Sequence, residues 1–272
     1  MDDTETAPPG PSTEYSRWRS YGLAAAGVEG WFSDMSAALW DGFLAFQAAR
    51  HKLIRGGMLE IGCAHGRAAL MLGLHGRLGE TIHLIDYNPA HARNAAHLVG
   101  GHSASRVEGH AIYSERASTD FLPSRGIRFL HIDGDHGRWA LHNDLDIAHR
   151  VVAPEGVVVL DDFLAPQFIG VTIGAIEWMT RNPEAFEMML VGFNKAYLVR
   201  PRAAQMFQEF IRDELPAHLR ACGQPDFTLW RTDDRRACAS FGITPRQFDR
   251  DFVTREFAMA KPELLVDGKL VL

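Results

Sequence analysis

Two apolar segments that end in aspartates constrain the fold of this chain more than any other feature. The segments read F-L-H-I-D-G-D-H from Phe129 and V-V-V-L-D-D-F up to Phe163. Apolar runs of this kind are typical of strands buried on both faces of a parallel sheet. Because neighbouring parallel strands lie about 4.8 Å apart, pairing of these two strands would bring Asp133 close to Asp161 and Asp162 at one sheet edge.

The chain from Gly57 onward alternates apolar strand-like and helix-like segments. We expect strands and helices in turn, at 58–62, 66–74, 81–86, 89–99, 106–111, 127–132, 138–152, 157–160 and 168–179, with a turn at 154–156. A Gly/Asn turn at 192–194 predicts an antiparallel hairpin after them. The order indicates an α/β fold, a doubly wound Rossmann-like seven-stranded sheet with an antiparallel terminal hairpin. Such sheets bind ligands at the carboxyl ends of their strands.

Helical extensions are expected on both sides of this sheet. The predicted organisation is a disordered tail, a helical cap, a core and a helical C-terminal extension, at 1–16, 17–56, 57–200 and 201–272. In the extension, Thr244 and Pro245 have the pattern of an N-cap followed by Pro at the first helical position, which predicts a helix to about Ala258. The extension could cap a substrate site or form an oligomer contact, and a homodimer is compatible with it.

Composition narrows the class of protein. The 272 residues carry a net charge of −6, which argues against a nucleic-acid backbone as the partner. The three cysteines include no C-x-x-C pair, a pattern typical of a reducing compartment. No apolar run reaches the ~20 residues of a membrane span, and the acidic, Pro-rich start is unlike a signal peptide. We therefore expect a cytoplasmic protein that acts without a membrane.

A glycine-containing loop follows the first predicted strand of the core. Gly62 and Gly66, on either side of Cys63, allow the backbone to bend tightly and to approach a ligand. The loop lacks both the dinucleotide fingerprint and the G-K-[ST] of a phosphate loop. It suits S-adenosyl-L-methionine, whose carboxylate needs backbone N–H groups and whose ammonium needs an acceptor such as Glu60. The alternative is a simple glycine turn between a strand and a helix.

Asp86 ends the next predicted strand. A carboxylate at this position can accept hydrogen bonds from both hydroxyls of a ribose. Alternatively, Asp86 caps the helix that follows it. Tyr87 and Ser114 are further candidates, as groups that wall or hydrogen-bond an adenine.

The three aspartates at the strand ends form a candidate metal site. Asp133, Asp161 and Asp162 offer hard oxygen ligands, which suit Mg²⁺ (or Mn²⁺/Ca²⁺) better than zinc. Asp133 is also a candidate for the cofactor site and for catalysis. His136 lies three residues further on, where a general base could remove a hydroxyl proton. Acids at strand ends also cap helices, and Asp135 fits that role better.

With these residues in place, the chain resembles the class I S-adenosylmethionine-dependent methyltransferases from about residue 28 to residue 200. The pair I-D-G-D-H and L-D-D-F is similar to one branch, the metal-dependent O-methyltransferases of macrolide and aminocoumarin sugars. The resemblance implies that Asp133, Asp161 and Asp162 bind Mg²⁺ and that His136 serves as the base. Ala64 departs from the glycine common in E-x-G-x-G loops, and the region after Arg200 resembles nothing known to us.

The leading hypothesis is therefore a divalent-metal-assisted methyltransferase that modifies a small-molecule hydroxyl acceptor, such as a sugar or natural product. A second hypothesis is a metal-independent small-molecule O- or N-methyltransferase that uses His136 as its base. A third is a non-catalytic cofactor-binding protein. A nucleic-acid methyltransferase is disfavoured because the chain lacks an N-P-P-Y-like motif.

Overall fold

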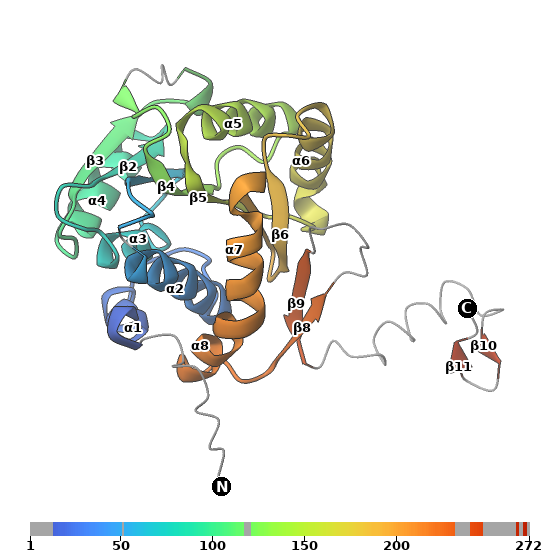
Figure 1. The fold of residues 1–272 in the computed structure, drawn as a ribbon. Helices are drawn as coiled ribbons and strands as arrows, with labels where there is room; N and C mark the ends of the chain where they lie inside the picture. The colour runs from blue at the N-terminus through green and yellow to red at the C-terminus, as the bar shows by residue number, and fades with distance from the viewer. Residues whose placement is uncertain are drawn as a thin grey trace, which may run out of the picture.

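The computed structural model describes residues 13–50, 52–116, 121–231 and 240–246, and the backbone of the short strands β10 (Leu265–Val266) and β11 (Lys269–Leu270). Its centre is one mixed sheet flanked by helices on both faces (Figure 1). No helix in these residues is long and apolar enough to cross a membrane.

The sheet has the strand order β3-β2-β1-β4-β5-β7-β6-β9-β8. Its parallel part is built from β1 (Gly57–Ile61), β2 (Thr81–Asp86), β3 (Arg106–Ala111), β4 (Ile127–Ile132) and β5 (Val152–Asp161). The chain runs outward from β1 to β3 and then restarts beside β1 with β4. The carboxyl ends of β1 and β4 therefore lie at the point where the strand order reverses, which is where open α/β sheets bind their ligands.

The remaining strands close the other side of the sheet. The predicted hairpin is present as β6 (Glu187–Gly192) and β7 (Lys195–Val199), and β7 pairs antiparallel with β5. The prediction of seven strands is corrected to nine, because β8 (Phe227–Arg231) and β9 (Phe241–Pro245) extend the sheet beyond β6. The expected turn at 154–156 is also corrected: it lies within β5, where the register with β4 shifts.

Thr244 and Pro245 do not open a helix. Both lie in β9, which is antiparallel to β8 and parallel to β6. The local capping pattern is overridden here by pairing with a strand that is distant in sequence. The rest of the expected helix, to Ala258, lies outside the described residues. The C-terminal extension is thus part helix and part sheet.

Each face of the sheet has its own apolar core. One core joins the sheet to α2 (Asp34–Ala49), α3 (Ala69–Leu74), α4 (Pro89–Gly100) and α7 (Ala204–Glu209). The other joins it to α5 (Arg138–Val151) and α6 (Ile169–Arg181). In Figure 1, α5 and α6 lie on one side of the strands and α2 and α7 on the other. Alternation of side chains along each strand produces this division.

Helix α2 is the centre of the first core. It begins after Ser33, whose hydroxyl accepts from the N–H of Ser36, as expected for an N-cap. Thirteen of its sixteen residues are buried, because the sheet lies on one side of it and α8 (Leu215–Ala221) on another. An apolar helix of this kind requires cover all round, and the short α1 (Trp18–Ala24) provides part of it.

Asp41 connects α2 to three other parts of the chain. Its carboxylate accepts hydrogen bonds from the hydroxyl of Ser16 and the N–H of Arg17, both at 2.7 Å. It also contacts Nε2 of His75 at 2.8 Å and Nε2 of His218 at 2.9 Å. Burial would raise the Asp41 pKa, but the hydrogen bonds with the two histidines outweigh it and hold the pKa far below its usual range. Residues 13–16, expected to belong to a disordered tail, are ordered up to this anchor.

We expect Asp41→Ala to lower the free energy of unfolding by about 3–5 kcal/mol, the usual cost of removing one partner from a buried charged cluster. Urea unfolding followed by circular dichroism measures this. Asp213→Ala is the matched control, since Asp213 and its partner Arg212 are both more than half exposed. Equal stability of the two variants would contradict the anchoring role of Asp41.

Candidate active site

The glycine loop makes the sharp turn that its sequence predicts. Gly62 and Gly66 have φ angles of +86° and +82°, and Ala64 between them has +41°. A Cβ on Gly62 would lie 1.8 Å from the carbonyl oxygen of Asp133. Only glycine therefore allows the carboxyl ends of β1 and β4 to approach so closely. Cys63 is buried, and burial raises its pKa, so the residue contributes packing rather than a thiolate.

Asp86 holds the glycine loop from the neighbouring strand. Its Oδ2 accepts from the N–H of Ala64 at 2.9 Å, and its Oδ1 accepts from the N–H of Asn88 at 2.8 Å. Helix α4 is capped by Asn88, whose side chain accepts from the N–H of Ala90. The capping function considered for Asp86 thus belongs to the residue two positions later, while Asp86 joins the loop to β2.

Exposed aromatic side chains lie beyond Asp86. Tyr87 is 63% exposed and stacks on Tyr113, with the ring centroids 5.5 Å apart. Ser114 follows at the start of a 3-10 turn and hydrogen-bonds with Asp144. Tyr87, Tyr113 and Ser114 therefore follow the carboxyl ends of β2 and β3, next to the loop. Sequence reasoning did not single out Tyr113.

A buried row of four ionisable side chains crosses the sheet beneath the loop. Glu60 on β1 contacts His131 on β4 at 2.7 Å, and His131 contacts Asp161 on β5 at 3.2 Å. Lys195 on β7 donates to Asp161 at 2.5 Å. All four side chains are at most 8% exposed. We call Glu60, His131, Asp161 and Lys195 the buried row.

Acidic and basic side chains alternate along the buried row. Burial alone would lower the His131 pKa, but hydrogen bonds with Asp161 and Glu60 raise it to about 9. Burial would raise the Asp161 pKa, yet contacts with His131 and Lys195 hold it well below its usual range. Burial raises the Glu60 pKa, and its Oε2 has no hydrogen-bond partner among the described residues. The imidazolium of His131 thus lies between two carboxyl groups.

A second cluster lies at the sheet edge above this row. Nε2 of His136 lies 2.9 Å from Oδ2 of Asp162 and 3.7 Å from Oδ1 of Asp133. The His136 ring stacks on Phe168 with a centroid distance of 3.9 Å. The side-chain amide of Asn194 donates to Asp162 at 2.5 Å. Contact with Asp133 raises the His136 pKa, while burial raises that of Asp133.

The three predicted metal ligands are near one another but divide into two groups. Asp133 shares one group with Asp161 and His131, and another with Asp162 and His136; within each group the ligand atoms lie within 4.8 Å. Asp162 adopts a left-handed backbone (φ +53°), and its N–H donates to Asp161. Asp135 accepts from the N–H of Gly137, which is the N-cap residue of α5, so the expected capping role is corrected: α5 has no side-chain cap, and Asp135 makes only a local turn before it.

The three carboxylates suit a hard divalent cation, but that of Asp161 is already paired with the Lys195 ammonium. Asp133 and Asp162 are partly exposed at the mouth of the site and offer carboxylate oxygens. Oδ1 of Asp161 could bind a metal ion only if Lys195 withdraws, because the Lys195 ammonium group already contacts this oxygen. Two cations cannot share that oxygen without strong repulsion.

Sequence reasoning missed two members of the buried row. His131, which the sequence does not assign to the site, is fully buried and bridges two of the predicted site acids. It lies two residues before Asp133 on the same strand, a spacing that could have indicated its position. Lys195 follows the predicted hairpin turn and pairs directly with Asp161 across the antiparallel ladder.

The stability of the protein should fall as the pH is raised through the His131 titration. A His pKa raised from about 6.5 in the unfolded chain to about 9 in the folded protein stabilises the fold fully below pH 6.5. This contribution, about 3 kcal/mol, is lost as the pH rises to about 9.

Urea unfolding at pH 6, 7.5 and 9 measures this effect. We expect a smaller dependence in His131→Gln than in the wild type. His97→Gln, which changes an exposed histidine on α4, is the control. A wild-type profile that stays flat over this range would contradict a protonated His131.

Comparison with known proteins finds a family model that matches the middle of the chain. Residues 59–163 match the model of a methyltransferase domain family. No curated protein matches the chain. Among solved structures, the chain is similar to the O-methyltransferase NovP, with 15% identity, 61% of this chain and 80% of that chain covered, and a TM-score of 0.49.

Two further structures have comparable likeness. An O-methyltransferase from Bacillus cereus in complex with SAH is 17% identical over 73% of this chain and 94% of that chain, with a TM-score of 0.47. The SAH-bound methyltransferase PaMTH1 from Podospora anserina is 14% identical over 72% and 98%, with a TM-score of 0.45.

Proposed function

We propose that this chain, whose residues 59–163 match a methyltransferase domain model, transfers the methyl group of S-adenosyl-L-methionine to a hydroxyl group of a small molecule. The observation that carries the proposal is the cluster of Asp133, His136 and Asp162 at the carboxyl ends of β4 and β5. It adjoins the glycine loop, since Gly62 packs against the backbone of Asp133. Cofactor and acceptor would therefore meet at this edge of the sheet.

The proposed cofactor site uses the residues singled out from the sequence. The backbone of the Gly62–Gly66 loop, including Cys63, would receive the carboxylate of the cofactor. Asp86 would accept from the ribose, because each of its oxygens accepts from one backbone N–H and retains a lone pair. Nδ1 of His91 lies 3.5 Å from Oδ1, so Oδ2 is the less crowded of the two oxygens. Tyr87 and Ser114 would contact the adenine. The unpaired Oε2 of Glu60 is a buried acceptor that an ammonium group would satisfy.

His136 is the proposed base. If its Nε2–H donates to Asp162, the lone pair is on Nδ1, and that atom would take the proton of the acceptor hydroxyl. The Asp162 carboxylate then stabilises the imidazolium that results. Stacking on Phe168 holds the plane of the ring. Transfer is an in-line displacement, so the remaining task of the site is to hold the hydroxyl oxygen close to the methyl carbon.

We further propose a divalent cation, Mg²⁺ in the first instance, held by Asp133 and Asp162 with Asp161 as a third ligand. When bound, such an ion lowers the pKa of a substrate hydroxyl and orients it. Lys195 controls whether Asp161 can take part. In its present position the Lys195 ammonium already lies 5.5 Å from the centroid of the Phe32 ring, so a cation–π contact is available to it on that side.

A metal-independent reaction is the second candidate. The ion pair between Lys195 and Asp161 favours it, because the pair already neutralises the carboxylate that a metal would need. His136 would then act alone on the acceptor. The two candidates share the cofactor site and the base and differ only in the requirement for a cation.

Calorimetric titration of Mg²⁺ into the complex with S-adenosylhomocysteine separates the two candidates. For the metal-assisted reaction we expect binding in the wild type and at least tenfold weaker binding in Asp162→Asn. Lys195→Met should bind Mg²⁺ more tightly, because Asp161 becomes available. Asp135→Asn is the matched control, since among the described residues the Asp135 carboxylate accepts only from the backbone N–H of Gly137 in the turn before α5. Absence of Mg²⁺ binding, with full activity in a chelator, would establish the metal-independent reaction.

Replacement of His136 tests the base. We expect His136→Gln to bind S-adenosylhomocysteine normally and to lose about 10²–10⁴-fold in the rate of methyl transfer, the usual contribution of a general base. Turnover is followed by release of S-adenosylhomocysteine with a panel of vicinal-diol sugars and phenols. Unchanged turnover in His136→Gln would exclude this residue as the base. Absence of cofactor binding in the wild type would overturn the proposed function itself.

A further inference from the structure

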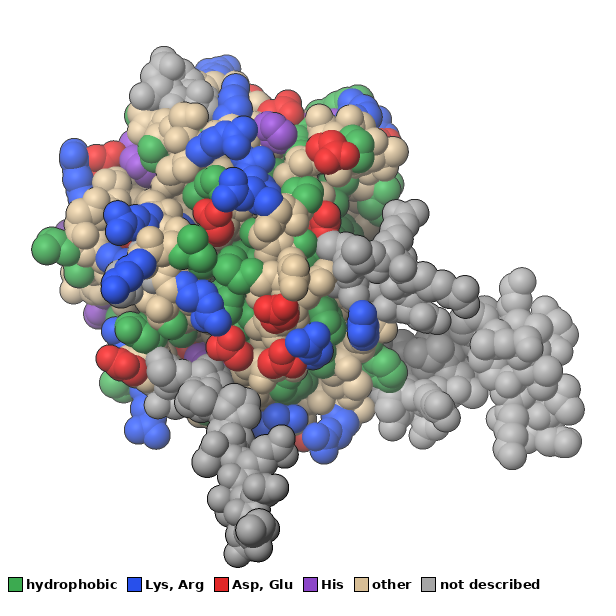
Figure 2. Space-filling view, in the orientation of Figure 1, with side chains coloured by type: hydrophobic (Ala, Val, Ile, Leu, Met, Phe, Trp, Pro, Cys, Tyr) green, Lys and Arg blue, Asp and Glu red, His purple; other side chains and the backbone are tan. Residues whose placement is uncertain are grey.

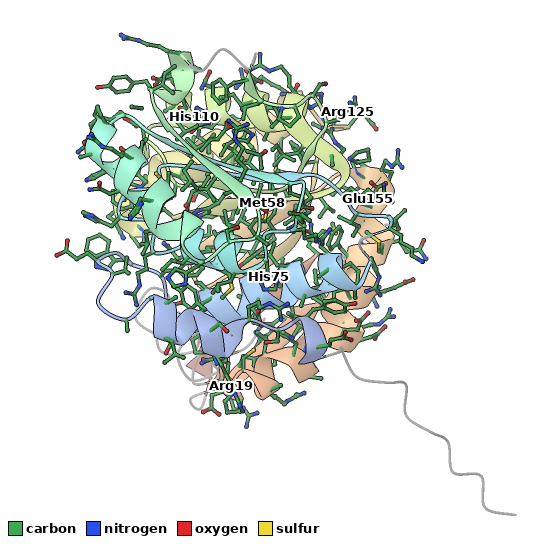
Figure 3. All side chains as sticks on the ribbon, turned by 90° about the vertical axis from the view of Figure 1, so that its left-hand side faces the viewer. Arg19, Met58, His75, His110, Arg125 and Glu155 are labelled. Atoms are coloured by element: carbon green, nitrogen blue, oxygen red, sulfur yellow. The ribbon has the colours of Figure 1, made fainter. Side chains whose placement is uncertain are left out.

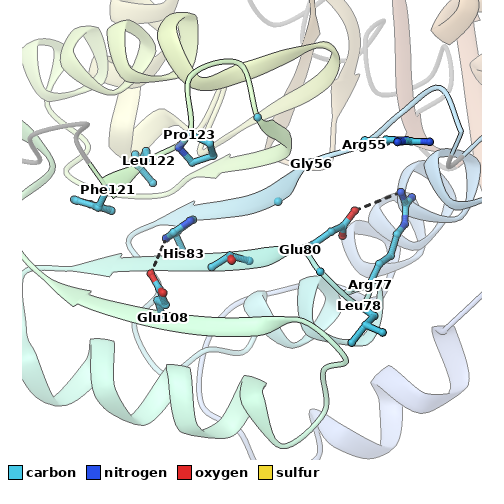
Figure 4. Close-up of a pocket in the computed structure, with 14 residues that line it drawn as sticks. Arg55, Gly56, Arg77, Leu78, Glu80, His83, Glu108, Phe121, Leu122 and Pro123 are labelled. Carbon is cyan, nitrogen blue, oxygen red and sulfur yellow. Dashed lines mark hydrogen bonds and ion pairs between the residues drawn. The ribbon is translucent and has the colours of Figure 1, made fainter.

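A pocket opens at the edge of the sheet opposite the candidate active site. It encloses about 870 Å³ and is lined by residues at the amino ends of the strands, among them Gly57 of β1 and Thr81 of β2. Gly126, which precedes β4, closes it on another side. In Figure 4 the pocket lies between the segment of Phe121, Leu122 and Pro123 and strands β2 and β3.

One wall of this pocket carries a compact group of potential metal ligands. Nδ1 of His83 lies 3.1 Å from Nε2 of His110 and 3.4 Å from Oε2 of Glu108. Nε2 of His110 lies 3.7 Å from the same carboxylate oxygen. The other oxygen, Oε1, pairs with Arg106 at 2.8 Å. Among the three facing atoms, only the two ring nitrogens have hydrogen-bond geometry.

The spacing of these atoms matches one face of a tetrahedral metal site. Zinc bonds to imidazole nitrogen at about 2.0–2.1 Å and to carboxylate oxygen at about 2.0–2.2 Å. Tetrahedral angles then place the ligand atoms about 3.3–3.6 Å from one another. The three observed separations, 3.1, 3.4 and 3.7 Å, fall around this range. Small shifts of the side chains would equalise them around an ion.

The backbone makes this arrangement rigid. His83 and Glu108 are direct partners in the parallel ladder between β2 and β3, and His110 lies two residues further along β3 on the same face. The ring of His110 stacks on Phe121 at a centroid distance of 4.2 Å. His83 is buried, and the side chains of Glu108 and His110 are 25% and 19% exposed. Ligands fixed by two paired strands need little reorganisation to bind a metal.

We propose that His83, Glu108 and His110 bind a Zn²⁺ ion whose fourth coordination position opens into the 870 Å³ pocket. His83 and Glu108 both line the pocket (Figure 4). Two imidazoles and one carboxylate with an open position form a donor set that zinc uses outside purely structural sites. Water or a small anionic ligand would complete the tetrahedron, with Arg55 and Arg77 lining the same pocket.

This zinc site is separate from the candidate active site. On β2, His83 alternates with Ile82 and Leu84, which belong to the core beneath α2, so His83 faces the opposite side of the sheet. The buried row lies on the α2 side. It is also separate from the cluster of Asp41: Figure 3 shows His110 and His75 on opposite sides of Met58.

Metal analysis of untagged full-length protein tests the proposal without any assay of activity. After incubation with Zn²⁺ and exhaustive dialysis, we expect about one zinc ion per chain by mass spectrometry. His83→Gln, Glu108→Gln and His110→Gln should each bind Zn²⁺ at least tenfold more weakly. His97→Gln, an exposed histidine on α4, should retain it. Thermal melting followed by circular dichroism identifies any variant that fails to fold. If His83→Gln does not fold, the variants at the partly exposed Glu108 and His110 still test the proposal.

Three other groups of potential ligands among the described residues could bind zinc, two of them sharing Asp133, and the experiment distinguishes them from the proposed site. The ligand atoms of Asp41, His218 and Cys222 also lie within 4.8 Å of one another. Co²⁺ can replace Zn²⁺ as a spectroscopic probe. Co²⁺ bound by the Cys222 thiolate would show a thiolate charge-transfer band, whereas Co²⁺ bound by His83, Glu108 and His110 would not. Asp133→Asn should leave the zinc content unchanged. A thiolate band, zinc lost in Asp133→Asn, or no zinc in the wild type would each overturn the proposal and leave the proposed methyl transfer untouched.

Discussion

The buried row of Glu60, His131, Asp161 and Lys195 is the interaction on which the rest of the structure depends. Four ionisable groups from four adjacent strands are removed from water, and each is tolerated only because its neighbour carries the opposite charge or a hydrogen-bond partner. A shift of any strand by one residue would turn one member to the other face of the sheet. The row thus fixes the register in which β1, β4, β5 and β7 end, and with it the position of the glycine loop and of the strand-end aspartates.

Helix α2 and the residue Phe32 before it cover the buried row and exclude water from it. Trp40 packs edge-on against the His131 ring at 4.5 Å, and Phe32 lies beside the Lys195 ammonium. The outer side of α2 must itself be covered. Helix α7 contributes through aromatic contacts such as that of Phe43 with Phe207, whose ring centroids lie 6.0 Å apart, and α8 packs beside it. The outer surface of the assembled layers shows basic, acidic and hydrophobic side chains together on the face in Figure 2. The C-terminal extension therefore supports the active site indirectly, through α2.

Local patterns in the sequence predicted the elements whose structure is decided locally. Apolar runs ending in acids identified β4 and β5, and the glycine spacing identified the turn after β1. Features decided by distant partners were not predictable in this way. Pro154 to Gly156 resembles a turn but bulges within β5, and Thr244 resembles an N-cap but pairs in β9. Lys195 is an ordinary residue after a hairpin turn until the antiparallel register places it opposite Asp161.

Asp161 belongs both to the buried row and to the proposed metal site. One side of its carboxylate contacts His131 of the buried row, and the other contacts Lys195 and the N–H of Asp162. Each partner stabilises the ionised form, so the carboxylate remains charged without a cation. A metal ion in place of the Lys195 ammonium would bring two positive charges to the Asp161 oxygen instead of one. The carboxylates of Asp133 and Asp162, which contact His136 at the mouth of the site, would have to balance the additional charge. The arrangement is thus stable without a metal, and in the proposed metal-assisted reaction the position of Lys195 would decide whether Asp161 can act as a ligand.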